Sequence, residues 1–305
     1  RKKEKDGSFS GGAFYYIANG LKQRWLGMLA AIFCLLAAVG MSGVQTNKIT
    51  GSYTSVLGND SAAVKLIIGG IVAFFAAVVI IGGIKRIGRI ASMLVPFMSL
   101  LFIAMAFVII GKNYTAVPET FRLIFTSAFS SKAVAGGVGG FAFSQIIKKG
   151  LARGVFSNEA GLGSSVIAHS ASETREPVKQ GLWGIFEVFF DTFVICTLTA
   201  LVILTTNIGS GAYENGSFFG AVNAAGEFVG ASDSATALSA FSSNLGMFGT
   251  VAFLIILPLF AFTTVLAWSY YGEKAVDFCF RHKPENKRKI PVLIFKIIFI
   301  LLIVF

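Results

Sequence analysis

Long apolar stretches alternate with short polar ones along most of the chain. Four uncharged stretches have about the length that spans a bilayer, and two more are equally apolar but carry isolated charged residues. The four are residues 25–44, 66–84, 90–111 and 248–271, and the two are residues 181–206 and 290–305. This pattern predicts an all-α, multi-pass membrane protein.

A weaker segment, residues 136–172, is apolar and glycine-rich but interrupted by charged residues. Loop charge tests whether it also crosses, because cytoplasmic loops gather Lys and Arg. If it crosses, the basic clusters at 1–5 and 281–289 fall on one side, and a long stretch without Lys or Arg falls on the other. We therefore predict seven crossings, with Arg1 in the cytoplasm and an extracellular loop over residues 207–246.

Composition agrees with a membrane location and narrows the partners. The chain is 55% hydrophobic and 13% charged, whereas globular proteins have about 25% charged residues. The net charge of +11 raises nucleic acid as a partner, but the basic residues lie in short clusters between apolar stretches. We expect the lipid bilayer as the partner and no nucleic acid. The three cysteines suggest neither a disulfide framework nor a metal site.

Both ends of the chain suggest a longer protein. It begins at Arg1 rather than at a methionine, and it ends inside the apolar stretch 290–305. That stretch is shorter than the roughly 20 residues that a span needs. We expect the chain to be the middle part of a longer membrane protein.

A polar run lies at bilayer depth in the weak fourth crossing. Ser157, Asn158 and Glu159 point in three directions around a helix, so they cannot all face one polar interior, and Gly161 and Gly163 follow them. One interpretation is a glycine-rich packing face with satisfied polar side chains. The adjacent Asn and Glu favour the other, an unwound break near Ser157 and Asn158. Such breaks expose carbonyl groups for a cation and N–H groups for a carboxylate.

The run at residues 153–164, RGVFSNEAGLGS, closely resembles the signature of the sodium:alanine symporter family, the alanine or glycine:cation symporters. Further similar motifs follow the family's order, at residues 11–17, 42–47, 82–87, 95–98, 191–197 and 260–273. The resemblance implies a leucine-transporter-type (LeuT-type) bundle of two inverted repeats. Residues 1–305 would then be a single transporter domain covering about helices three to nine, with the first two helices and a C-terminal part absent.

The resemblance also implies a pocket for a small neutral amino acid, alanine or glycine. Its substrate-binding residues would be Gln45, Phe156, Ser157, Asn158, Gly161, Thr264 and Trp268. Spacing supports one pair independently, because Thr264 and Trp268 share a helix face. The bulk of Phe156 and Trp268 favours a small substrate. An interfacial anchor is the other interpretation of Trp268.

Sodium takes oxygen ligands, so the hydroxyls of Thr263 and Thr264 are the candidates for an Na⁺ site. Proton coupling stays open, because Glu159, Glu187 and Asp191 are carboxylates at membrane level. For the last two, a buried network is favoured over a proton relay. Their partner in such a network would be Arg153 or a hydroxyl group.

Two other function classes are weaker. A membrane enzyme would have to use Ser157, Glu159 and His169, without a recognisable catalytic motif. A channel would use residues 136–140 as a filter, but no second copy exists in the sequence. We therefore expect a symporter of the cell membrane and not an enzyme. The choice among L-alanine, D-alanine and glycine stays open, as does the oligomeric state.

Overall fold

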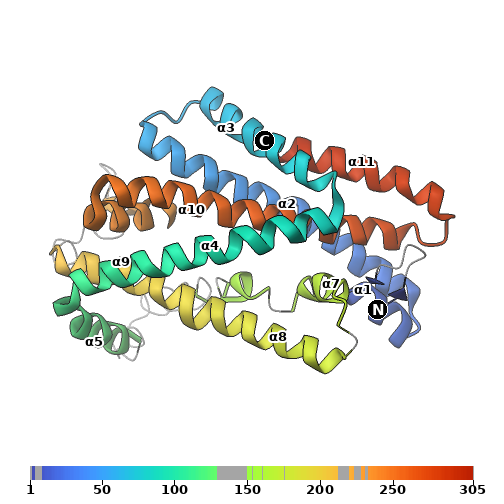
Figure 1. Cartoon of the computed structure of the whole chain (residues 1–305), viewed down its shortest axis with the longest axis horizontal. Helices are drawn as coiled ribbons and strands as arrows, with labels where there is room; N and C mark the ends of the chain where they lie inside the picture. The colour runs from blue at the N-terminus through green and yellow to red at the C-terminus, as the bar shows by residue number, and fades with distance from the viewer. Residues whose placement is uncertain are drawn as a thin grey trace. The chain divides into compact units, whose positions relative to one another are not determined.

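The structure is a computed structural model, and most of its elements are helices (Figure 1). It describes residues 2–3, 9–128, 150–152, 154–159, 161–174, 176–211, 220–222, 228–230 and 233–304. Within these residues, five helical stretches are long and apolar enough to cross a membrane. They are α2 (Arg24–Leu57), α3 (Ala62–Ile80), α4 (Gly83–Lys112), the continuous stretch Pro177–Gly209, and α10 (Asp233–Cys279). Each contains most of one predicted apolar stretch, so the prediction of a multi-pass membrane protein is confirmed.

The remaining elements are shorter. The helices are α1 (Ala13–Gly20), η1 (Tyr114–Ala116), α5 (Val117–Ala128), α7 (Ser165–Ser170), α8 (Pro177–Phe189), the π-helix η3 (Phe190–Cys196), α9 (Thr197–Gly209) and α11 (Glu285–Val304). Two antiparallel hairpins pair β1 (Lys2–Lys3) with β2 (Phe9–Ser10) and β3 (Gly220–Val222) with β4 (Phe228–Gly230). The described chain is mainly helical, as predicted, and the hydropathy pattern does not reveal the pairing of these short strands.

Helix α2 continues well beyond the predicted end at residue 44. Its later turns contain Ser and Thr, whose hydroxyls donate to carbonyls of the preceding turn: Thr46 to Ser42 at 3.0 Å and Ser52 to Lys48 at 2.7 Å. These bonds satisfy the polar groups inside the helix. The helix ends at Gly58, whose φ of 62° only glycine adopts readily.

The stretch predicted as a loop, residues 207–246, contains regular structure in its described part. It holds the end of α9, the β3–β4 hairpin and the beginning of α10 at Asp233. Gly246, with φ 60° and ψ −143°, interrupts α10 where the apolar stretch begins. The hydropathy pattern does not predict the part of α10 before Gly246, because this part is not apolar enough to be recognised as a membrane span.

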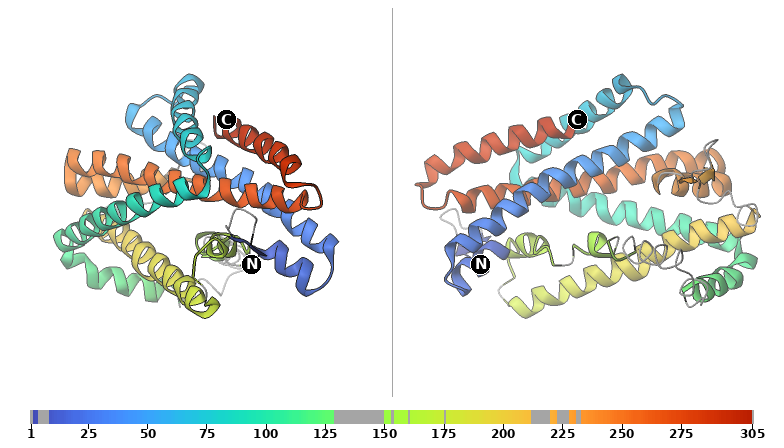
Figure 2. Two further views of the ribbon diagram at one scale, coloured as in Figure 1. Left: turned by 45° about the vertical axis from the view of Figure 1, so that its right-hand side comes forward. Right: turned by 180° about the vertical axis from the view of Figure 1, so that it is seen from behind.

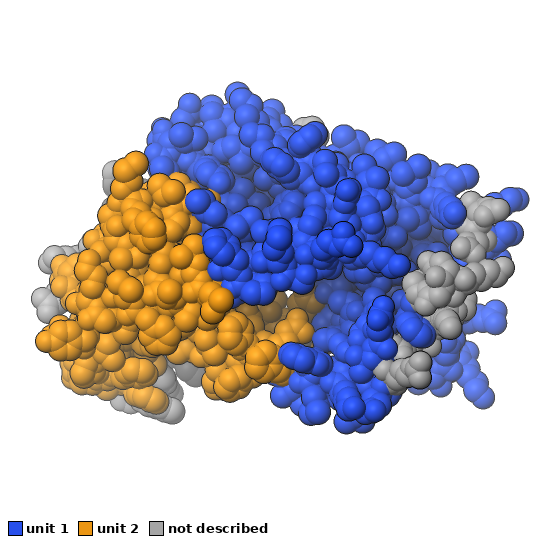
Figure 3. All heavy atoms as spheres, in the orientation of Figure 1, with its two compact units in different colours: residues 1–99, 162–185, 255–305 blue, residues 100–161, 186–254 orange. Residues whose placement is uncertain are grey.

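The chain divides into two compact units (Figure 3). The first comprises Arg1–Ser99, Leu162–Ile185 and Ile255–Phe305, and the second comprises Leu100–Gly161 and Phe186–Leu254. In the first unit, α11 packs against both α2 and α3 (Figures 1 and 2). Glycine allows the close approach, since a Cβ at Gly69 would lie 2.9 Å from the carbonyl oxygen of Val304.

Two ion pairs join α10 to α11 in the first unit. Lys296 lies 2.9 Å from Glu273, and Arg288 lies 3.0 Å from Asp277. All four side chains are largely buried, so each charge needs its partner. The predicted helix over residues 290–305 is present as α11, but it is not among the five candidate spans, because Lys and Arg fill its first turns.

The second unit is held together by aromatic contacts and by hydrogen bonds between polar side chains. Phe241 of α10 lies 5.6 Å from Phe102 of α4, between ring centroids. The amide of Asn113, which follows the last residue of α4, donates to Asn244 Oδ1 of α10 at 2.6 Å, and the Asn244 amide donates to Thr206 Oγ1 of α9 at 2.8 Å. These bonds link the end of α4 to α10, and α10 to α9.

Candidate functional site

The helix in the fourth predicted crossing is interrupted where the sequence predicts. Residues 150–152 and 154–157 are helical, and Asn158 N–H closes the last turn on the carbonyl of Gly154 at 3.2 Å. The described residues between 157 and 165 form no helix, and α7 then begins at Ser165. We call this interval the break. The prediction of an unwound segment near Ser157 and Asn158 is confirmed, while residues 136–149 lie outside the described chain.

Left-handed backbone conformations produce the break. Glu159, Gly161 and Gly163 have φ values of 49°, 80° and 68°. Two of the three are glycines, which adopt these values without steric cost. Glu159 is a non-glycine residue in the same region, a conformation that concentrates at functional sites. The local sequence therefore encodes the interruption.

Both polar residues at the end of the first helical half bind to a segment 34 residues further along the chain. The hydroxyl of Ser157 donates to Asp191 Oδ2 at 2.5 Å. Asn158 accepts from the hydroxyl of Thr192 at 2.7 Å, while its own amide donates to the carbonyl of Gly154 at 3.0 Å. These bonds fix the end of the helix and orient the residues that begin the break.

Asp191 and Thr192 lie on the π-helix η3, between α8 and α9. A π-helix inserts extra backbone into an α-helix and often marks a functional position. Cys196, at its end, lies 3.7 Å from the Ser157 hydroxyl. The sequence predicts Arg153 or a hydroxyl group as the partner of Asp191, and the structure has the hydroxyl of Ser157 in this role. Arg153 lies outside the described residues.

The predicted ion ligands, Thr263 and Thr264, lie on adjacent positions of α10. Both hydroxyls donate to the same carbonyl, that of Phe260, at 2.9 Å and 3.0 Å. Each hydroxyl oxygen keeps lone pairs after donating its proton. The two oxygens are therefore available as ligands for a hard cation. Among the described residues, no group of three or more His, Cys, Asp or Glu side chains has a geometry suited to a metal ion.

Trp268 is 1% exposed and packs edge-on against Tyr271, with the ring centroids 5.3 Å apart. Its indole N–H is buried and has no hydrogen-bond partner among the described residues. Buried donors in native proteins are nearly always paired. Trp268 is thus a packed side chain with one unused donor, rather than an anchor at the membrane surface.

The predicted substrate residues divide between the two units. Gln45, on α2, belongs to the first unit with Thr264 and Trp268, whereas Phe156 and Gly161 belong to the second with Ser157 and Asn158. Gln45 is half-buried, and Phe156 is 37% exposed. Within the second unit, the structure brings Ser157 and Asn158 into one bonded cluster with the π-helix. A single pocket formed by all of these residues stays a prediction.

Thr192 is the functional candidate that sequence reasoning missed. It binds Asn158 directly, yet nothing in its local pattern distinguishes it from other threonines in apolar stretches. The available signal was its position next to Asp191, a carboxylate at membrane depth. The π-helix itself has no recognisable sequence signature here.

His169, the imidazole considered for an enzyme, is engaged elsewhere. Its Nδ1 lies 2.7 Å from the side-chain amide of Gln180, within the first unit. The hydroxyl of Ser157, the nucleophile in that interpretation, donates to Asp191. The geometry of Ser157 therefore does not support nucleophilic catalysis with His169.

Comparison with known proteins gives the family. A model of the sodium:alanine symporter family matches residues 1–305. The sodium/alanine symporter AgcS of Methanococcus maripaludis is 37% identical over 283 residues, which cover 91% of this chain and 57% of that protein. The probable sodium/glutamine symporter GlnT of Bacillus subtilis is 35% identical over 305 residues, covering 99% of this chain and 57% of that protein.

A third relative differs in the ion that its name gives. The putative sodium/proton-dependent alanine carrier protein YrbD of Bacillus subtilis is 36% identical over 291 residues, covering 94% of this chain and 57% of that protein. The chain spans about half the length of the curated relatives it matches. The family model matches this chain from residue 1 to residue 305, and the motifs of the chain resemble those of the same family. The chain therefore belongs to the sodium:alanine symporter family.

Proposed function

We propose that the complete protein is a sodium-coupled symporter of small neutral amino acids, alanine or glycine, which works by alternating access. The observation that carries this proposal is the break that follows Ser157, in a segment of a membrane transporter. Main-chain groups in an interrupted helix leave the helical hydrogen-bond ladder, so carbonyls become ligands for a cation and N–H groups become donors to a carboxylate.

The substrate pocket in this proposal uses the predicted residues. Trp268 supports it, because a buried indole N–H without a partner is suited to donate to an amino-acid carboxylate. Phe156 and Trp268 would limit the size of the substrate, with Gln45, Ser157, Asn158, Gly161 and Thr264 as the remaining contacts. Of the three related proteins described above, two are named for alanine and one for glutamine. The bulk of the two rings favours alanine or glycine.

Sodium would bind at the hydroxyls of Thr263 and Thr264, whose lone pairs stay available. One charge that crosses 100 mV supplies about 2.3 kcal/mol, enough to concentrate a neutral zwitterion roughly fifty-fold. A single Na⁺ is therefore sufficient for uptake. Proton coupling through Asp191 is the alternative. It is supported by the hydrogen bond from Ser157, at the beginning of the break, to the Asp191 carboxylate, and by the relative named for both ions.

The proposed architecture is a leucine-transporter-type bundle in the cell membrane, with this chain as about helices three to nine. The broken fourth crossing would then be helix six, and Arg1 would lie in the cytoplasm. Residues 207–246 would form an extracellular connection that contains the β3–β4 hairpin and the first part of α10. The charge distribution along the sequence supports this orientation.

The test is uptake of radiolabelled alanine by the complete gene product in proteoliposomes. Sodium outside is replaced by choline in one arm, and a proton gradient is imposed in another. We expect saturable uptake that requires sodium and that glycine inhibits. Uptake driven by the proton gradient without sodium would favour the alternative ion. A conductance that does not saturate would show a channel and overturn the proposal.

A further inference from the structure

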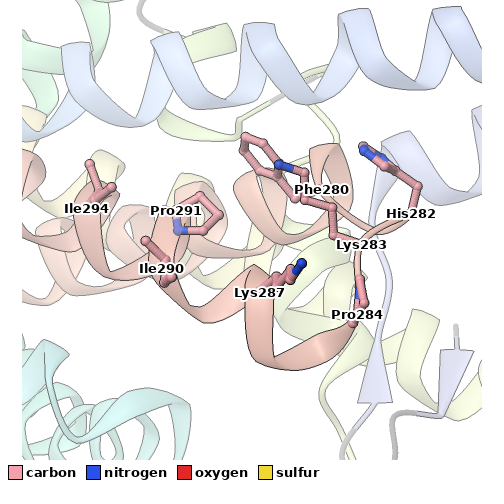
Figure 4. A pocket seen from close by; sticks show the side chains of 8 residues that line it. All are labelled: Phe280, His282, Lys283, Pro284, Lys287, Ile290, Pro291 and Ile294. Carbon is pink, nitrogen blue, oxygen red and sulfur yellow. The ribbon is translucent and has the colours of Figure 1, made fainter.

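The turn between α10 and α11 forms an open groove in the first unit (Figure 4). Its volume is about 610 Å³. The lining residues are Phe280, His282, Lys283, Pro284, Lys287, Ile290, Pro291 and Ile294. We call this surface the basic groove. Its polar residues, together with Phe280 and Pro284, lie in the turn and the first part of α11, and Ile290, Pro291 and Ile294 follow along α11, as Figure 4 shows.

Lys283 and Lys287 give the groove its charge. The Lys283 ammonium lies 5.0 Å from the ring centroid of Phe280. Among the side chains that the structure describes, no carboxylate pairs with either lysine. Arg288, in the same region, is by contrast neutralised by Asp277. The groove therefore presents two positive charges that its described protein neighbours leave uncompensated.

The apolar end of the groove is exposed, like other apolar side chains of α11. Ile290 is 62% exposed and Ile294 is 51% exposed, one helical turn apart on the same face of α11. Exposed large aliphatic side chains in sequence on one face indicate contact with lipid or a partner. Pro291 continues this surface between them.

The position of the groove indicates which partner fits. It follows directly on α10, one of the helices that are long and apolar enough to cross a membrane. The end of a spanning helix lies at the level of the lipid headgroups. A phospholipid presents a charged phosphate first and an acyl chain next, in the same order as the lysines and isoleucines along the groove. Basic pockets at this level bind anionic headgroups.

We propose that the basic groove binds an anionic phospholipid. Its phosphate lies between Lys283 and Lys287, and one acyl chain covers Ile290 and Ile294. A free phosphate would leave the apolar half of the groove unused. A zwitterionic lipid would bring a positively charged ammonium group towards the lysines, and the repulsion between like charges would weaken its binding.

The test is native mass spectrometry of the delipidated complete gene product, titrated with phosphatidylglycerol, phosphatidylcholine or inorganic phosphate. Phosphatidylglycerol is expected to bind most tightly. The Lys283→Gln and Lys287→Gln variants should each bind it about fivefold more weakly, and the double variant about 25-fold more weakly. Both lysines are exposed, so these substitutions leave the fold intact. Phosphatidylcholine binding should not change.

The matched control is the double variant Lys85→Gln with Lys289→Gln. Both residues are exposed, Lys289 lies in the same basic cluster 281–289 as the two groove lysines, and neither lines the groove. The control should bind phosphatidylglycerol like the unmodified protein. An equal loss in both double variants would show unspecific surface attraction and overturn the proposal, as would unchanged binding in the Lys283→Gln/Lys287→Gln variant.

A second pair of substitutions tests the apolar half. Ile290→Ser with Ile294→Ser keeps the lysines, so it should weaken phosphatidylglycerol binding and leave the binding of inorganic phosphate unchanged. If inorganic phosphate binds as tightly as phosphatidylglycerol and the isoleucine substitutions change nothing, the groove is a site for a free anion. That result would overturn the assignment to a lipid.

Discussion

The hydroxyl of Ser157 donates a hydrogen bond of 2.5 Å to the carboxylate of Asp191, which lies 34 residues further along the chain. Ser157 ends a helical segment, and Asp191 lies on a π-helix. A hydrogen bond to an ionised acceptor is about twice as strong as one between neutral groups. The bond therefore links the beginning of the break to the π-helix.

Replacing Asp191 with Asn should impair transport. The substitution keeps the shape of the side chain but removes the charge, and hydrogen bonds to charged groups contribute about 1.5–3 kcal/mol. We expect alanine uptake by the complete gene product to fall about tenfold or more. Glu187→Gln, an exposed carboxylate one turn earlier on α8, is the control and should have a smaller effect. Equal losses would point to a general effect of charge.

Trp268→Ala should admit larger amino acids. The side chain is almost fully buried, so its removal opens space where the substrate is proposed to bind. We expect glutamine to compete with alanine about tenfold more effectively than in the unmodified protein, because a change in pocket size typically alters selectivity by at least this factor. Trp183→Ala, at an exposed Trp of α8, is the control. Unchanged selectivity in Trp268→Ala would remove Trp268 from the pocket.

Thr263→Ala should weaken the dependence on sodium, because it removes one proposed oxygen ligand. The sodium concentration for half-maximal uptake should rise by at least about tenfold, because even the loss of a residue that only supports a metal ligand lowers metal affinity by about that factor. Thr263→Ser keeps the hydroxyl and should retain the sodium response. If the alanine variant responds to sodium like the unmodified protein, this residue is not a ligand.

Gly163→Ala should destabilise the break. Gly163 has a φ of 68°, and an added Cβ would lie 2.7 Å from the Cβ of Ala13. A left-handed conformation costs a non-glycine residue roughly 1–2 kcal/mol. Thermal unfolding in detergent should therefore occur at a lower temperature. Gly154→Ala is the matched control, since that helical position is open and alanine favours helix; a similar loss there would contradict the explanation.

The pH dependence of α5 should follow Glu119. Hydrogen bonds from Arg122, both 2.7 Å, lower the pKa of Glu119 below its ordinary value of 4.5. A lowered pKa in the folded state contributes stability above the ordinary pKa, and this is lost as the pH falls through the lowered value. Amide protection factors in α5 should therefore decrease below pH 4.5. The Glu119→Gln variant should lack this dependence, and an identical profile would contradict the assignment.

The location of the spanning helices could be predicted because hydropathy is a local property. Residues 66–84 and 90–111, for example, are apolar enough to identify α3 and α4 without any knowledge of their neighbours. The break was also predictable, since Gly161 and Gly163 permit left-handed conformations that local sequence alone specifies. The continuation of α2 beyond residue 44 was missed, because hydroxyls that bond back to their own helix escape a hydropathy scan.

By itself, the sequence determined the membrane class, the family motifs, and the position of the break, because each depends on residues close together in the chain. Only the tertiary structure showed that Ser157 binds Asp191, that Asn158 binds Thr192, and that Lys296 pairs with Glu273. These partners are distant in sequence, and many polar side chains compete for each bond. Which of them meet is decided by how the helices pack, since a polar group in an apolar environment is stable only beside the partner that packing brings to it.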